Sequence, residues 1–276
     1  MSTDLPVLLP LKRRAPASAP PLLQGRHGVW LALALGLAVT VGEAHAGPGE
    51  DSIVAAILKW TPLLGQGFAL NVAMSFLAMA IGTAAGTLLG LCSISLMPPV
   101  RTSSWLVTQI FRNAPWLVLL FYCMLLLPFE LRIGGVVIPL PGWIKATFGL
   151  SLPVMANMSE IVRGAVQSIP YGQWESAESL AFTRRQTLWM IILPQCVKRM
   201  LPPWMNLYAI LVVGTPLCSI VGVNEAMTLT NDALAAEARR ELLVPMYLYL
   251  LLWFFLYCYP IALWTSALER KFAVDA

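Results

Sequence analysis

Long apolar stretches separated by short polar segments dominate the pattern of this chain. A membrane-spanning helix needs about 20 mostly apolar residues, and five stretches reach that length: 63–91, 105–127, 143–166, 201–223 and 243–268. None of the five alternates apolar and polar residues with a period of two, which argues against a transmembrane β-barrel. The pattern predicts an all-α membrane protein with a five-helix core bundle.

A shorter apolar run precedes the five stretches, and two interpretations of it stay open. Basic residues at 12–14 and 26 stand before the run 29–41, which Ala44-His45-Ala46 follows. This order is typical of a signal peptide that is cleaved after Ala46. Residues 28–46 are also long enough to span as an extra, uncleaved helix. The chain is therefore divided into residues 1–46, a basic, Pro-rich tail with this segment, and 47–276, the transmembrane domain.

Composition narrows the class of protein further. Of the 276 residues, 58% are hydrophobic and only 12% charged, with a mean hydropathy of +0.72. A soluble domain carries about twice that charged fraction, and disorder requires low hydrophobicity, so both classes are excluded. The net charge of +4 includes no long basic block, so nucleic acid is not expected as a partner. The five cysteines are scattered without CxxC spacing, so no metal site is predicted.

The distribution of Lys and Arg predicts the orientation, because positively charged loops face the cytoplasm. If residues 1–27 lie inside, then 13 of the 18 Lys and Arg residues fall on the inner side of the spans. The outer side receives the remaining five: Lys59, Arg132, Lys145, Arg239 and Arg240. We therefore expect a multi-pass protein with a cytoplasmic C-terminus.

The longest predicted inner connection, residues 170–199, contains more than a short polar connector would. Trp174, Ala177 and Ala181 recur at the spacing of one face of a short helix. A second apolar piece follows, and Pro194 is expected to end it, since proline lacks the N–H that a continuing helix donates. The segment is predicted to form two short helices on the inner membrane face. From the pattern alone, an amphipathic anchor resting on lipid headgroups is the alternative.

This loop resembles the EAA loop of ABC-importer permeases. The family pattern reads E-A-A, three residues, G, nine residues, I-x-L-P, and the chain matches its spacing with two departures. Ser176 replaces the first family alanine and Ala181 replaces the glycine, which permits a sharp turn between the two helices. The resemblance implies that this loop couples the chain to an ATPase through Glu175, Ser176, Ala177, Ala181, Ile191, Leu193 and Pro194.

Further segments resemble the permeases for polar amino acids, in the order 60–67, 110–118, 160–175 and 213–223, and the resemblance covers residues 57–272. It implies the type I-like five-helix fold of ABC importers and a permease that translocates polar amino acids across a bacterial inner (plasma) membrane. The implied partners are an ATP-binding subunit dimer, a second permease chain, identical or different, and an outer solute-binding protein. ATP and Mg would bind the ATPase, and no cofactor is expected on this chain.

A zwitterionic substrate in a low-dielectric bundle needs partners for its carboxylate and its ammonium group. The charged candidates for the pathway are Arg112 and Arg163 with Glu160, and the neutral ones are Asn113, Thr215 and Ser219. Four of these six residues also have a structural interpretation. Glu160 and Arg163 are spaced for an i,i+3 ion pair, and the hydroxyls of Thr215 and Ser219 can bond to carbonyls of their own helix.

No motif for chemistry is present in the sequence. No Gly-Lys-Ser/Thr triplet of a nucleotide-binding loop occurs, and both histidines, His27 and His45, precede the predicted core. The chain is therefore expected to be no enzyme, with ATP hydrolysis on a partner. The alternative function is a secondary transporter of small polar solutes that works without an ATPase, which would predict internal repeats and mid-helix charges.

Overall fold

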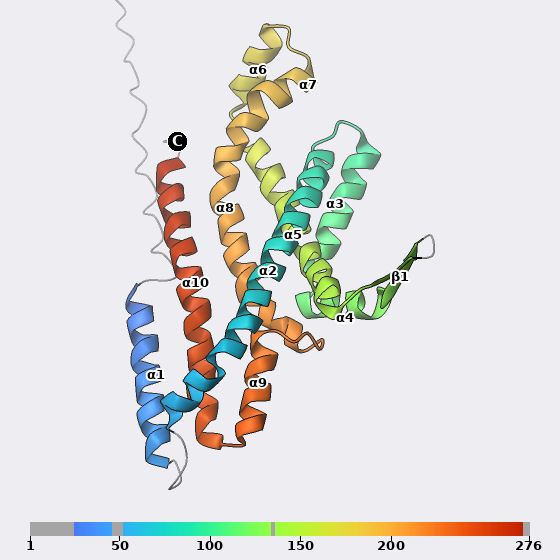
Figure 1. The fold of residues 1–276 in the computed structure, drawn as a ribbon. Helices are drawn as coiled ribbons and strands as arrows, with labels where there is room; N and C mark the ends of the chain where they lie inside the picture. Colours follow the sequence, from blue (N-terminus) through green and yellow to red (C-terminus); the bar gives the residue numbers. More distant parts are fainter. Residues whose placement is uncertain (1–24, 46–51, 134–135, 273–276) are drawn as a thin grey trace, which may run out of the picture.

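The computed structural model describes residues 25–45, 52–133 and 136–272. The long helices run along one elongated bundle, and α4 lies across it (Figure 1). The helices are α1 Gly25–His45, α2 Ile53–Ser93, α3 Pro98–Asn113, α4 Trp116–Leu126, α5 Gly142–Gln167, α6 Tyr171–Ser179, α7 Arg184–Gln186, α8 Leu193–Gly214, α9 Ala226–Glu237 and α10 Leu243–Phe272. A π-helical segment, η1 Thr187–Ile192, joins α7 to α8, and two 3₁₀ segments, η2 Thr215–Ser219 and η3 Arg240–Leu242, flank α9.

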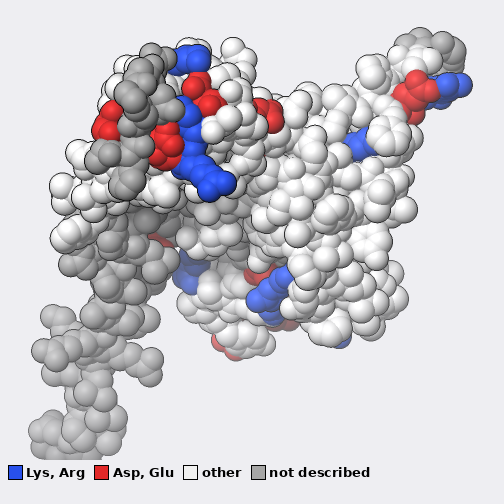
Figure 2. Space-filling view, turned by 90° about the horizontal axis from the view of Figure 1, so that it is seen from below, with Lys and Arg blue, Asp and Glu red and all other residues white. Residues whose placement is uncertain are grey.

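The prediction of an all-α bundle is confirmed, with one small addition. Strands β1 Glu130–Ile133 and β2 Val136–Pro139 form an antiparallel hairpin in which Leu131 pairs with Ile138. The hairpin projects from the side of the bundle between α4 and α5, with acidic and basic side chains close to its tip (Figures 1 and 2). These are the exposed ion pair of Glu130 and Arg132.

The second predicted span, 105–127, is wrong as a single helix. Two helices, α3 and α4, meet there at an angle of 103°. Pro115 lacks a backbone N–H and disfavours helical geometry at the residue before it. Ala114 and Pro115 accordingly have extended dihedral angles, with ψ near 136° and 131°. The apolar pattern continues through the break, so hydropathy alone did not reveal it.

The closest packing in the bundle lies between α2 and α5. Gly82, Gly86 and Gly90 recur every four residues on the buried side of α2. A methyl group on Gly86 would lie 2.6 Å from Met158 Cβ, and one on Gly90 would lie 2.7 Å from Val162 Cβ. Glycines at this spacing allow the two backbones to approach closely, which stabilises helix pairs in membranes by van der Waals contact. α5 also contacts α3, α4 and α8, so it forms the centre of the bundle.

The fourth predicted span, 201–223, is shifted in the structure. One continuous helical stretch runs from Arg184 to Ser219 and includes α7, η1, α8 and η2. The expectation that Pro194 ends a short helix is therefore wrong. Pro194 lies in the first turn of α8, where its missing N–H costs little because the preceding π-helical segment has altered the hydrogen-bond register.

In the described part of the chain, three helices are long and apolar enough to cross a membrane. The number becomes four if the bent α3–α4 pair is counted as one span. The three are Ile53–Ser93, Arg184–Ser219 and Arg240–Lys271, which contain most of the first, fourth and fifth predicted spans. α5 coincides with the third predicted span but is absent from this set, because Lys145, Asn157 and two serines, Ser151 and Ser159, lower its hydropathy. The bundle buries Lys145, Ser151 and Ser159, and Asn157 is half-buried.

Helix α1 packs along α10 (Figure 1). Gly28 faces the ring of Phe255, and Val39 packs on the cluster that contains Ile53, Leu242 and Met246. Near the end of α1, the Glu43 carboxylate accepts a hydrogen bond of 2.6 Å from the backbone N–H of Ile53, the first residue of α2. The Pro-rich tail and the position after Ala46 lie outside the described residues.

A polar cluster ties α9 to the first turns of α2. Lys59 Nζ and Trp60 Nε1 both donate to Glu237 Oε1, over 2.7 and 2.8 Å. These hydrogen bonds, from Lys59 first and Trp60 second, lower the pKa of Glu237. The cluster lies at the end of the bundle where α9 leads into α10, which Figure 2 views end-on as a mostly uncharged surface with a few groups of charged residues.

Candidate functional site

The predicted coupling loop forms one short helix and a turn that leads into the long α7–α8 stretch, at the end of the bundle opposite to α9 (Figure 1). Glu175 and Ser176 are exposed on α6, whereas Ala177 is buried. The Ser176 hydroxyl donates to Gly172 O within α6. Ile191 and Leu193 are half-buried around the α6 base and Pro194 is exposed. The predicted residues are thus brought together, but in one short helix and the start of a long one.

The turn after α6 explains why glycine suits position 181. Ala181 has φ of +57°, in the left-handed region. Its N–H donates to Glu178 O over 2.8 Å, and the Phe182 N–H donates to Ala177 O over 3.1 Å. These two bonds define the Schellman motif, in which the residue after the cap is usually glycine. Ala181 therefore keeps the ordinary geometry of this turn and does not impose another one.

We expect Ala181→Gly to stabilise the protein by about 0.5–1 kcal/mol, because glycine removes the steric cost of the left-handed conformation. Thermal unfolding of the purified protein checks this. The matched control is Ala235→Gly on the exposed face of α9, which should destabilise by about 1 kcal/mol. Equal shifts for both variants would contradict the assignment of the turn.

Two side-chain contacts, both missed from the sequence, attach this loop to the bundle: one joins α6 to α8 and the other joins α7 to the turn after α2. Gln195 Nε2 donates to Gln173 Oε1 over 2.5 Å and to Ile191 O over 2.8 Å. Arg184 Nη2 reaches back to Ile94 O, in the turn between α2 and α3, over 3.3 Å. No sequence signal pairs these residues, because they are far apart along the chain and their types are ordinary for a surface loop.

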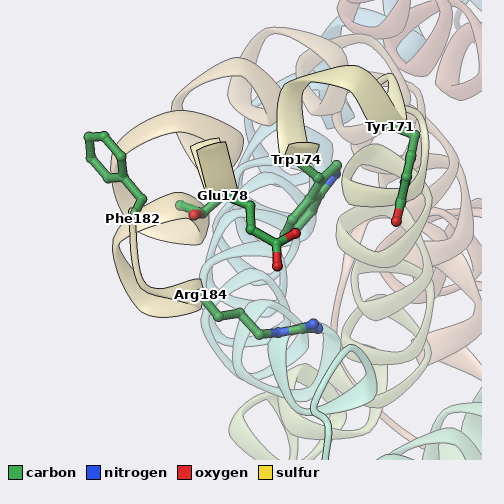
Figure 3. A pocket seen from close by; sticks show the side chains of 6 residues that line it. Tyr171, Trp174, Glu178, Phe182 and Arg184 are labelled. Atoms are coloured by element: carbon green, nitrogen blue, oxygen red, sulfur yellow. The ribbon is translucent and has the colours of Figure 1, made fainter. Parts of the chain in front are cut away.

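A hollow of about 510 Å³ opens between α6 and the start of α7. Trp174, Glu178 and Arg184 turn toward it, whereas the ring of Phe182 points away (Figure 3). The Arg184 guanidinium lies 6.0 Å from the centre of the Trp174 ring, within the range of a cation–π contact. The hollow therefore combines the aromatic ring of Trp174 with the carboxylate of Glu178 and the guanidinium of Arg184. Such a surface at the end of the bundle suits a protein partner.

The charged pathway candidates form a triad across α3 and α5. Arg163 Nη2 lies 2.5 Å and Arg112 Nη1 3.7 Å from Glu160 Oε2. The i,i+3 pairing of Glu160 with Arg163 is present, and Arg163 also donates to Gln167. Glu160 is largely shielded, with 17% of its side chain exposed, whereas that of Arg112 is 46% exposed. A net positive, partly open group of this kind can bind a carboxylate.

Arg112 and Asn113 lie close to the bend between α3 and α4. They end α3, about 20 Å along its axis from Pro98, because α3 extends further toward the turn after α2 than hydropathy suggested. Asn113 is exposed and its amide donates to Gln109, both to the carbonyl and to the side chain. It does not contact the triad through any hydrogen bond in the described residues.

Thr215 and Ser219 are bonded within their own segment. The Thr215 hydroxyl donates to Val212 O and the Ser219 hydroxyl to Pro216 O, both over 2.7 Å. Thr215 is fully buried and also accepts a bond from Asn71 Nδ2 at 2.9 Å. Their role in a substrate pathway stays a prediction, and the structure places them apart from the triad as a second polar group.

The sequence analysis missed two buried polar residues beside Thr215. Asn71 of α2 and Glu225, before α9, are both 0% exposed and joined by a hydrogen bond of 2.8 Å. The signal was available, because an amide inside the span 63–91 and a carboxylate directly after 201–223 are costly in a membrane protein. Within the described ranges, no group of three His, Cys, Asp or Glu residues has the geometry to hold a metal ion.

Comparison with known proteins gives a consistent result. The family described as binding-protein-dependent transport system inner membrane component matches residues 82–274. The inner membrane amino-acid ABC transporter permease protein YhdY of Escherichia coli is 28% identical over 234 residues, which cover 80% of this chain and 63% of YhdY. The chain thus spans less than two thirds of that relative. The probable amino-acid ABC transporter permease protein YckA of Bacillus subtilis is 31% identical over 212 residues, covering 77% of this chain and 90% of YckA.

The fold has a counterpart among solved structures. A crystal structure of an amino acid ABC transporter with histidines aligns with a TM-score of 0.69 at 22% identity, over 80% of this chain and 99% of that one. The fold is therefore that of an ABC importer permease, with a five-helix core formed by α2, the α3–α4 pair, α5, α8 and α10. From the match to more than half of its length, the chain belongs to the family of binding-protein-dependent transport system inner membrane components.

Proposed function

We propose that this chain is the membrane-spanning permease subunit of an ABC importer for polar amino acids in a bacterial inner membrane. The observation that carries the proposal is the exposed helix α6, which is attached to the base of the long stretch 184–219 by the Gln173–Gln195 bond. The printed names of YhdY and YckA supply the substrate class. They also favour the importer over a secondary transporter that works without an ATPase.

The arrangement of the loop supports a mechanical role. α6 rests on a buried cluster contributed by α5, the segment between α5 and α6, η1 and α8: Ala165, Val166, Ile169, Ile192 and Cys196. A displacement of α6 by a partner therefore acts on two long helices at once, since a packed interior transmits displacement without compressing. An ATP-binding subunit that closes on ATP would supply the displacement, and this chain would convert it into a change of access.

The partners follow from what this chain lacks. Five core helices give too small a bundle to enclose a complete pathway, so a second permease chain, identical or different, is proposed to pair with this one. An outer solute-binding protein would deliver the amino acid, and a dimer of ATP-binding subunits would hold ATP and Mg. The cations Arg184, Arg185, Lys198 and Arg199 gather around the coupling loop, and this supports a cytoplasmic loop and C-terminus.

The test is uptake by the complex reconstituted in proteoliposomes with its co-purified partners. ATP-dependent import of a polar amino acid is expected, and import without ATP would favour the secondary transporter. Glu175→Lys should lower uptake at least about tenfold while the chain still inserts, because it places a cation on the exposed face of α6 where the partner docks. Glu269→Lys, an equal charge change on the exposed end of α10, serves as the control and should transport normally.

We also propose that α1 remains in the mature protein as a sixth helix. Cleavage after Ala46 would remove the Glu43 carboxylate that accepts from Ile53 N–H, and would expose Phe255 and the apolar cluster under Val39. Sequencing the N-terminus of the purified protein is expected to find residues that precede α1. A mature chain that starts at Gly47 would contradict this proposal and support the signal peptide.

A further inference from the structure

The long helical stretch 184–219 is followed by a non-helical break before α9. Residues 220–225 form this break, and Gly222 has φ of +82°, a conformation that L side chains rarely adopt. α9 then continues toward the end of the bundle where α10 begins (Figure 1). The break therefore leaves the first N–H groups of α9 without helical partners inside the bundle, where they need other acceptors.

Two side chains supply those acceptors. Glu225 Oε2 accepts from Met227 N and Oε1 from Thr228 N, each over 3.0 Å. Asn71 Oδ1, from the middle of α2, accepts from Ala226 N over 3.0 Å. A residue of α2 thus caps α9 together with the cap residue of α9 itself, so the start of α9 is complete only while it lies against α2.

Both amide hydrogens of Asn71 are used in hydrogen bonds. Its Nδ2 donates both hydrogens, to Glu225 Oε2 over 2.8 Å and to Thr215 Oγ1 over 2.9 Å. All three side chains are fully buried. In the part of the chain that the structure describes, no Lys or Arg forms an ion pair with Glu225, so its carboxylate depends on Asn71 and on the N–H groups of α9.

The backbones of α2 and α9 approach so closely beside Asn71 that no other side chain fits between them. A methyl group on Gly67, one turn before Asn71 on α2, would lie 2.7 Å from Ala226 Cα. A shift of α9 along α2 would break the bond between Asn71 and Glu225 and the bond from Ala226 N–H to Asn71 Oδ1. Each such loss costs free energy in a low-dielectric interior, so α2, η2 and α9 favour one relative position.

We propose that Asn71 and Glu225 are positioning residues for transport, which fix α9 and the break at 220–225 to α2 so that these elements move as one unit when access changes. This inference rests on the proposed function for its role in transport. Its structural content, a constant α2–α9 distance, can be measured without any substrate. The unit would carry the motion of the coupling end to the opposite end of the bundle.

The test uses the full assembled transporter in a Cys92→Ser background, which removes the exposed native thiol. Spin labels at Leu58 of α2 and Asp232 of α9, both exposed, report the distance between the two helices. We expect one narrow distance distribution that is the same without nucleotide and with trapped ATP. A distance that changes between these states in the unaltered sequence would overturn the proposal.

Variants test the hydrogen bonds themselves. Asn71→Asp places two acceptors together and Glu225→Gln places two donors together, so each should broaden the α2–α9 distance and lower transport per ATP hydrolysed by about tenfold. The double variant Asn71→Asp with Glu225→Gln restores a donor–acceptor pair and should exceed each single variant by about threefold. Ser75→Ala, a buried hydroxyl of α2 that bonds to Tyr208 and not to α9, is the control and should behave like the parent.

The outcomes separate the inference from the proposed function. Parent-like transport and distances in both single variants, or a double variant no better than the singles, would overturn the inference. If a single variant does not assemble, Thr215→Val removes only one acceptor of Asn71, and an unchanged distance distribution in it counts against the inference. A parent protein that imports no polar amino acid would instead refute the proposed function, while the distance measurement still decides whether α2 and α9 form one unit.

Discussion

Replacing Gly86 with valine is expected to destabilise the bundle by about 3 kcal/mol or more and to abolish assembly of the transporter. A Cβ at this position would lie 2.6 Å from Met158 Cβ and still closer to the carbonyl oxygen of Met155. Backbone atoms of α5 cannot rotate away as a side-chain end can, so the two helices must separate. The measurement is the yield and thermal stability of the detergent-purified protein.

Gly164 offers a matched control for this substitution. It lies on α5, the partner helix of Gly86, and a Cβ there would meet nothing within 4 Å. Gly164→Val should therefore change stability by no more than about 0.5 kcal/mol. A stable Gly86→Val protein, or equal losses in both variants, would mean that the close approach of α2 and α5 does not hold the fold together.

Exchanging the charges of Glu160 and Arg163 is expected to lower transport at least about tenfold, although the i,i+3 spacing suggests a self-contained pair. The reason is Arg112, which lies 3.7 Å from Glu160. After the exchange, Glu160→Arg would face Arg112 with a like charge in a partly buried position, and like charges at this range repel. Uptake by proteoliposomes, with the chain amount quantified, measures the effect.

The same exchange at an exposed pair supplies the control. Glu130→Arg with Arg132→Glu reverses the ion pair on the hairpin, where water screens the charges and little loss is expected. Adding Arg112→Glu to the inner exchange inverts the whole triad. Recovered uptake would assign the triad to structure alone, whereas continued loss would support contact of a positive group with the substrate's carboxylate.

Local patterns in the sequence predicted the short helix and the turn within residues 170–199, whereas the contacts among the pathway candidates depended on helix packing. The spacing from Glu175 to Pro194 located α6 and the turn, because short-range helical periodicity and a turn residue are local properties. Ala181 occupies the left-handed position that the family glycine marks. The triad was predicted only as a pair, since the approach of Arg112 depends on how α3 crosses α5.

The prediction of spans from the sequence failed mainly where a helix breaks inside an apolar stretch. The pattern 105–127 was treated as continuous although Pro115 divides it, and 201–223 was extended past Ser219, where the helix ends. Hydropathy measures the preference of a segment for an apolar environment and is insensitive to backbone direction. A bend of 103° and a left-handed Gly222 leave that preference unchanged.

The sequence by itself determined that this chain is an α-helical membrane protein and which segments are apolar, because composition and periodicity express these properties locally. Motif spacing carried the resemblance on which the proposed coupling role of residues 170–199 rests. The tertiary structure alone decided that α2 and α5 meet through glycines, that Gln173 bonds Gln195, and that Asn71 caps α9. Those contacts join residues far apart in the chain. Their formation depends on the crossing of packed helices, which no local pattern encodes.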